Sequence, residues 1–122
     1  MELETAKRLR DASAACGEPI DMCAGRSRDD MYDDRMFQLA SRKLIEIVGE
    51  ALRQAEISDP KLVDSISDLR AIVNTRNRIV HGYNSINYSL LWDIIQIEMP
   101  PLKLLLDNLL REAPNFDDPM DI

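Results

Sequence analysis

Apolar residues recur along most of the chain at steps of three and four positions, which is the spacing of one face of an α-helix. In the first segment, about residues 2–23, the stripe consists of Leu3, Ala6, Leu9, Ala12 and Cys16. We expect a break or a kink at Gly17-Glu18-Pro19, because proline removes a backbone donor from a helix interior. Gly25 follows the segment and can take the left-handed conformation that ends a helix.

A second helical pattern begins near Ser27 and runs to about Ile57 as one element. Its apolar positions are Phe37, Ala40, Leu44, Ile47, Val48, Ala51 and Ala55. Four aspartates stand near its start: Asp29, Asp30, Asp33 and Asp34. The helix dipole favours negative charge at that end, so we interpret them as a helix start. A divalent-cation site is the less favoured alternative.

Two more helical regions complete the pattern. Asp59 as an N-cap and Pro60 in the first helical position mark a restart, and the pattern then continues to about Gly82. Asn87 can cap the last region, which the proline pair at 100–101 should kink or split. No segment alternates with a period of two residues, so we expect no sheet. The sequence predicts an all-α fold, a bundle of four to five helices with a kinked last helix.

Length and charge narrow the class of protein. The chain has 122 residues, enough for one domain, which we assign to residues 1–113, followed by a frayed acidic C-terminal tail at 114–122. Lys plus Arg is 15 and Asp plus Glu is 22, so the net charge is -7. This balance argues against a general field that attracts nucleic acid or membranes, although a local basic site remains compatible with it.

Other features of the composition point to the cytoplasm. We find no apolar stretch long enough to span a membrane and no apolar region of a secretory signal. Cys16 and Cys23 fit small buried thiols in a reducing compartment better than a redox pair. Because the chain has one histidine, cysteine and histidine cannot assemble a standard zinc site, and we expect no metal or other cofactor.

The run RNRIVHGY at positions 76–83 holds that histidine and is the candidate chemical site. Arg76 lies within the apolar stripe of its helix, so its permanent charge needs a carboxylate, a phosphate or another chain as partner. Asn77 and His81 are four residues apart and share a face, and Arg78 borders it. Tyr83 follows the expected helix end, from which its hydroxyl can point back towards the imidazole.

This set of residues suits metal-free cleavage of RNA. A neutral histidine can take the proton of the 2′-hydroxyl near pH 7, and arginine can stabilise the charge that develops on the phosphate. A second acid or base is missing from one chain, and a two-fold dimer would supply it. A structural role, with His81 as a partner of the helix dipole, fits the spacing about equally well.

Three stretches together resemble the HEPN superfamily. RNRIVHGY resembles its R-x4-6-H motif in the R-x4-H-x-Y form of the HepT-type toxins. IEIVGEALRQ at 45–54 is similar to the helix around the family's I-G-E-A core. YSLLWDIIQIEMPPL at 88–102 is similar to its pattern of a Trp followed by a proline pair and Leu. The resemblance extends from about Lys7 to Leu110, and the break expected at Gly17-Glu18-Pro19 departs from the family's first helix.

The resemblance implies a function. Such proteins are small helical homodimers that act as RNases, often in prokaryotic toxin–antitoxin pairs. It makes Arg76 and His81 the catalytic pair at the dimer cleft, with Asn77 as their support and Arg78 as a contact to RNA. Tyr83 matches the tyrosine that a cognate nucleotidyltransferase antitoxin modifies with AMP, and tRNA is an implied substrate. Two alternatives stay open: a non-catalytic HEPN module that binds a nucleotide or the partner nucleotidyltransferase, and a plain helical dimerisation protein.

Three other features are assigned more simply. Glu50 can pair with Arg76 or face solvent. Trp92 is expected in the core or in the dimer interface rather than stacked on a base. The leucine-rich run at 102–110 is expected to contribute to the bundle core.

Overall fold

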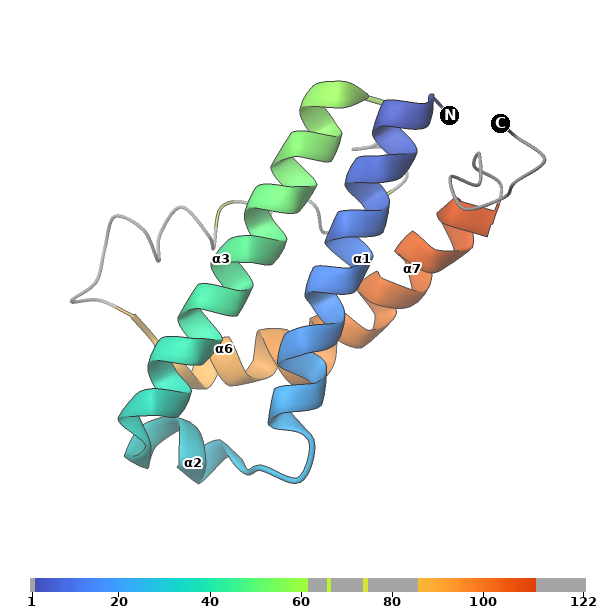
Figure 1. Ribbon diagram of the computed structural model, residues 1–122. Coiled ribbons are helices and arrows are strands. Elements are labelled where there is room, and N and C mark those ends of the chain that lie inside the picture. Colours follow the sequence, from blue (N-terminus) through green and yellow to red (C-terminus); the bar gives the residue numbers. More distant parts are fainter. Residues whose placement is uncertain (1, 62–65, 67–73, 75–85, 112–122) are drawn as a thin grey trace.

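A computed structural model describes residues 2–61, 66, 74 and 86–111 of the chain (Figure 1). The elements in chain order are α1 (Leu3–Cys23), α2 (Arg28–Asp33), α3 (Arg35–Ser58), α6 (Tyr88–Asp93), the π-helix η2 (Ile94–Glu98) and α7 (Met99–Arg111). These elements are all helical and the described residues contain no strand, which confirms the predicted all-α class. Most of the helical pattern expected at 60–82 and the tail at 114–122 lie outside the described residues.

The long helices α1 and α3 form the centre of the fold. They lie side by side and run in opposite directions, and α7 packs against α1 (Figure 1). Fully buried residues of all three meet in one core, among them Leu9, Ala12 and Cys16 from α1, Ile45, Val48 and Leu52 from α3, and Leu106 from α7. The stripe predicted for the first segment therefore faces the core, apart from Leu3, which is exposed.

The expected break in the first helix is wrong. Helix α1 continues without interruption through Gly17 and Pro19 to Cys23. Pro19 is buried, and the missing N–H deprives the helix of only the bond that would reach the carbonyl of Ala15. The helix ends at Cys23, two residues before the glycine that the sequence indicated, and Gly25 has a φ of +76°, a conformation that favours glycine.

The second predicted helix is two helices, which corrects the single element expected from 27 to 57. A capping box starts α2: the Ser27 hydroxyl accepts from the Asp30 N–H, and the Asp30 carboxylate accepts from the Ser27 N–H. Asp34 then leaves helical geometry, with φ -107° and ψ 104°. Its carboxylate accepts from the Phe37 N–H and caps α3. Asp29 and Asp30 thus lie in the first turn of α2 and Asp34 caps α3, as the dipole argument predicted, whereas Asp33 is the last residue of α2.

The last helical region is interrupted as expected, although ahead of the proline pair. Asn87 caps α6 by accepting from the Leu90 N–H at 3.1 Å, as the sequence predicted. The π-helix η2 follows, and the Met99 N–H bonds the carbonyl of Ile94, five residues back. Prolines at 100 and 101 have no N–H to offer to the preceding turn, which accounts for an irregular turn immediately before them.

Smaller predictions about the core are confirmed. Cys16 and Cys23 are both free and buried. Trp92 packs against the core with its ring 6.4 Å from that of Phe37. In the leucine-rich run, Leu102 and Leu106 are buried, whereas Leu104 is exposed on the other side of α7.

Candidate functional site

The residues predicted to carry chemistry, Arg76, Asn77, Arg78, His81 and Tyr83, lie outside the described residues. Their contacts with one another therefore stay predictions. The structure does describe where the chain departs towards this run, up to Lys61, and where it returns, from Ile86 onwards. Between those points Ile66 is described as a buried member of the core, and Asn74 as exposed and helical.

The C-terminal end of α3, from which the chain leads towards this run, is held against the start of α1. The hydroxyls of Thr5 and Ser58 are 2.7 Å apart and hydrogen-bonded, so the first turn of α1 is tied to the last turn of α3. Asp59 then leaves the helix, and its carboxylate accepts from the Lys61 N–H at 3.1 Å. This bond forms a turn at residues 59–61, and the start of the helix that Asp59 is predicted to cap lies outside the described residues.

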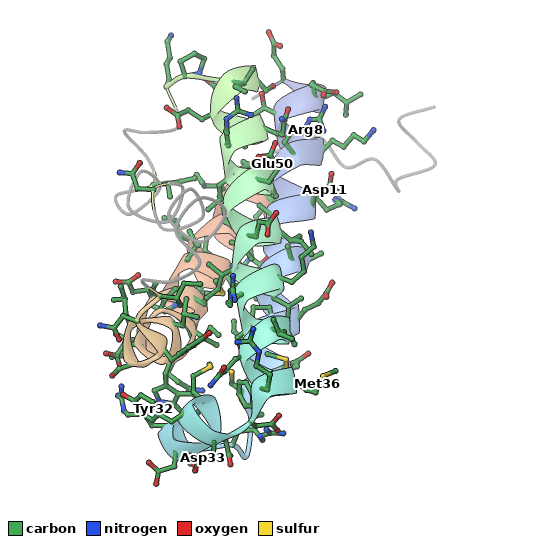
Figure 2. The ribbon with its side chains drawn as sticks, turned by 90° about the vertical axis from the view of Figure 1, so that its left-hand side faces the viewer. Arg8, Asp11, Tyr32, Asp33, Met36 and Glu50 are labelled. Carbon is green, nitrogen blue, oxygen red and sulfur yellow. The ribbon has the colours of Figure 1, made fainter. Side chains whose placement is uncertain are left out.

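Glu50 lies on the same half of α3 as this departing end. One carboxylate oxygen, Oε1, accepts from Gln54 at 2.9 Å and lies 3.5 Å from Arg53. Figure 2 shows Glu50 towards the end of α3 that is remote from Tyr32 and Asp33 of α2. Its side chain is 38% exposed, which places it at the edge of the helix as expected. The predicted pairing with Arg76 lies outside the described residues.

The returning end is fixed by two arginines that the sequence analysis did not single out. Arg28 donates through Nη1 to the Ser89 hydroxyl at 2.7 Å and to the Ser89 carbonyl at 3.3 Å. Its Nη2 donates to Asp93 at 2.7 Å. Arg35, at the start of α3, donates to the Tyr88 hydroxyl at 3.3 Å. The first turn of α6 is therefore attached to the corner formed by α2 and α3.

Charge strengthens that attachment. The hydrogen bond to Asp93 is the main cause that raises the pKa of Arg28 above its usual value, as expected for a charge-assisted bond. Sequence offers no signal for this contact, because 65 positions separate Arg28 from Asp93. Only the approach of α2 to α6 brings them together.

A second polar cluster joins α1 to α7 at the edge of the core, where Ser13 is buried and the side chains of Lys103 and Asp107 are partly exposed. The Ser13 hydroxyl donates to Asp107, and Lys103 donates to Ser13 at 3.1 Å and to Asp107 at 3.3 Å. These bonds hold the pKa of Asp107 below its usual value, chiefly through Ser13. Burial raises the pKa of the adjacent Cys16 thiol to about 12, so at neutral pH it is protonated and unreactive. The cluster therefore has a structural character.

Two classes of site receive no support from the described part of the chain. Within it, the His, Cys, Asp and Glu side chains do not gather in groups of three or more that could hold a metal ion. Among the described helices, none combines the length and the apolar character that a membrane span requires.

Comparison with known proteins gives one consistent result. Residues 6–109 match the family described as "Ribonuclease HepT-like". A "Putative RNase" of Methanocaldococcus jannaschii is 25% identical over 95 residues, which cover 78% of this chain and 86% of that protein. A "Putative RNase" of Caldanaerobacter subterraneus is 26% identical over 97 residues, which cover 80% and 86%. A "Probable ribonuclease HepT" of Thermococcus cleftensis is 27% identical over 75 residues, which cover 62% and 67%. No solved structure matches the chain.

Proposed function

The chain belongs to the HepT-like ribonuclease family, and from that premise we propose that it is a metal-independent endoribonuclease that acts as a toxin. The observation that carries the proposal is the run RNRIVHGY at 76–83, which falls inside the matched residues 6–109. It brings a base, two cations and an amide into eight consecutive positions of a chain whose family is named for RNA cleavage.

The proposed reaction needs no group beyond these side chains and water. His81 removes the proton of the 2′-hydroxyl, and the resulting oxyanion attacks the adjacent phosphorus while the bond to the 5′-oxygen breaks. The leaving 5′-oxygen takes its proton from the imidazolium of the second copy in a homodimer, and the other fragment ends in a 2′,3′-cyclic phosphate. Arg76 stabilises the charge that accumulates on the phosphate, Asn77 orients the imidazole, and Arg78 holds the RNA backbone.

A homodimer completes the proposed site. Because the chain has a single histidine, one copy offers an imidazole as base but no second imidazole as acid. Two copies related by a two-fold axis would place both His81 side chains and both Arg76 side chains at one cleft. A strictly monomeric active protein would contradict this arrangement.

We propose that a cognate nucleotidyltransferase antitoxin neutralises the enzyme by adding AMP to Tyr83. The adduct would place bulk and negative charge two residues from His81, where it would repel the phosphates of RNA. Transfer RNA is the substrate class that we propose, and the cytoplasm is the compartment in which RNA and antitoxin are both present.

The decisive experiment compares the purified wild type with His81→Ala. We expect the wild type to cleave RNA in the presence of EDTA, and His81→Ala to lose at least about a hundredfold in rate, which is the usual contribution of an acid–base group. Intact mass is measured on the same samples, because AMP on Tyr83 would make the wild type inert. Helix content by circular dichroism, unchanged in the variant, is the control for folding.

One outcome would favour a second function. If protein of unmodified mass forms dimers yet cleaves none of a varied set of RNAs, the chain is better described as a non-catalytic HEPN module that binds a nucleotide or the partner nucleotidyltransferase. The net charge of -7 favours this second function, because an acidic surface suits a basic partner protein better than a long RNA.

A further inference from the structure

We infer that Arg28 is a positioning residue for RNA cleavage, which acts by holding the first turn of α6 against the α2–α3 corner. The inference rests on the proposed function, because the residues that it positions are those of the run at 76–83. Arg28 lies about fifty positions before that run and makes no contribution to its motif.

Arg28 contacts α6 at two residues. Arg28 bridges Ser89 and Asp93, four residues apart on α6, and bonds both the backbone and the side chain of Ser89. Bonds to both residues fix the position of the first turn of α6 and the direction of its axis. Arg35 adds a bond to Tyr88, the first residue of the helix.

A short stretch of chain connects the run at 76–83 to α6. Three residues separate Tyr83 from Asn87, the N-cap of α6. Four chain steps span at most about 14 Å even when fully extended. The end of the run therefore lies within about 14 Å of Asn87. We expect a shift or rotation of the first turn of α6 to displace it, and an error of about 1 Å at a reacting group can cost about a hundredfold in rate.

An exposed arginine can also bind RNA directly, but the existing bonds of Arg28 favour a positioning role. The two terminal nitrogens of Arg28 already donate to acceptors of α6, and one of these is the carboxylate of Asp93. That carboxylate both occupies the guanidinium and offsets its charge, which makes Arg28 a weak receptor for a phosphate.

The experiment compares Arg28→Ala with Arg26→Ala as a matched control. Arg26 lies two positions earlier and pairs with Asp30 and Asp34, within the α2–α3 corner. We expect Arg28→Ala to lower kcat at least about tenfold with little change in KM, and Arg26→Ala to leave both near the wild-type values. The double variant Arg28→Asp with Asp93→Arg, which restores the pair in reverse, should recover a large part of kcat.

Each result has a distinct meaning. Wild-type kcat in Arg28→Ala overturns the inference, provided that His81→Ala is inactive in the same assay. A rise in KM with unchanged kcat, unrelieved by the reversed pair, also overturns it and assigns Arg28 to RNA binding. Equal losses in both arginine variants would mean a general effect of the corner and would likewise overturn it. Equal activity of His81→Ala and the wild type would instead refute the proposed function.

Discussion

The centre of the bundle and the α2–α6 corner differ in their polar contacts, although buried apolar residues such as Met31 and Leu91 join the corner to the same core. Along the α1–α3–α7 core the contacts are between fully buried apolar side chains such as Leu9, Leu52 and Leu106. At the α2–α6 corner the polar contacts that bridge the two elements are hydrogen bonds from Arg28, whose side chain is 43% exposed, to Ser89 and Asp93. The first kind is strong and is not weakened by the screening of charges. The second is weaker but directional.

This difference suggests a division of roles. Burial of apolar area supplies most of the stability of a small domain, but it fixes orientation loosely, since it is not directional. A charge-assisted hydrogen bond contributes little to stability at an exposed site, yet it holds two elements at a defined distance and angle. We therefore expect core substitutions to act on folding and corner substitutions to act on catalysis.

The largest effect on stability is expected from the core. Leu52→Ala should lower the free energy of unfolding by about 2–5 kcal/mol, because it removes a fully buried side chain and leaves a cavity. Leu39→Ala is the matched control on the same helix, where 41% of the residue is exposed, and should cost much less. Urea denaturation measures both. Similar losses for the two variants would contradict the assignment of α3 faces.

An intermediate effect is expected where a buried hydroxyl bonds a carboxylate at the edge of the core. Ser13→Ala removes the hydroxyl that donates to Asp107 and should cost about 1 kcal/mol at neutral pH. The folded-state pKa of Asp107 is lowered, so its carboxylate stabilises the fold above its ordinary pKa, and that stability is lost as the pH falls through the folded value. The difference between variant and wild type should therefore shrink below about pH 4. A difference that does not change with pH would refute this account.

The smallest effect on stability is expected at the corner. Arg28→Ala should lower the midpoint of urea denaturation less than Ser13→Ala does, because both members of the Arg28–Asp93 pair are substantially exposed. The loss should fade in about 1 M salt, where charges are screened beyond about 3 Å, whereas the loss in Leu52→Ala should persist. A large or salt-independent loss in Arg28→Ala would remove the contrast between the two regions.

Much of the fold could be predicted because it follows from local rules. The three- and four-residue spacing identified the helical segments, and Gly25 and Asn87 marked helix boundaries where the structure has them. Two predictions about where a helix is interrupted are wrong. Asp34 was read as one of several charges in a first turn, but it ends one helix and caps the next. Gly17-Glu18-Pro19 predicts a break or a kink, but α1 continues through Pro19, which is buried.

The candidate site also has features that local sequence patterns predict and features that they do not. The resemblance to the family and the choice of the residues proposed for catalysis rest on the run at 76–83 and the stretches at 45–54 and 88–102, all of which can be read from the chain. The attachment of the returning chain at Ser89 and Asp93 could not be read in this way, because no pattern within one segment indicates which arginine will reach it.

The sequence by itself determined the helical class, most helix ends and the residues proposed for catalysis, because each depends on neighbours within a few positions. The tertiary structure alone decided that α1 runs unbroken, that Asp34 divides two helices, and that Arg28 meets Asp93 across 65 positions. These outcomes depend on the packing of distant segments, where burial and long-range hydrogen bonds outweigh local preference.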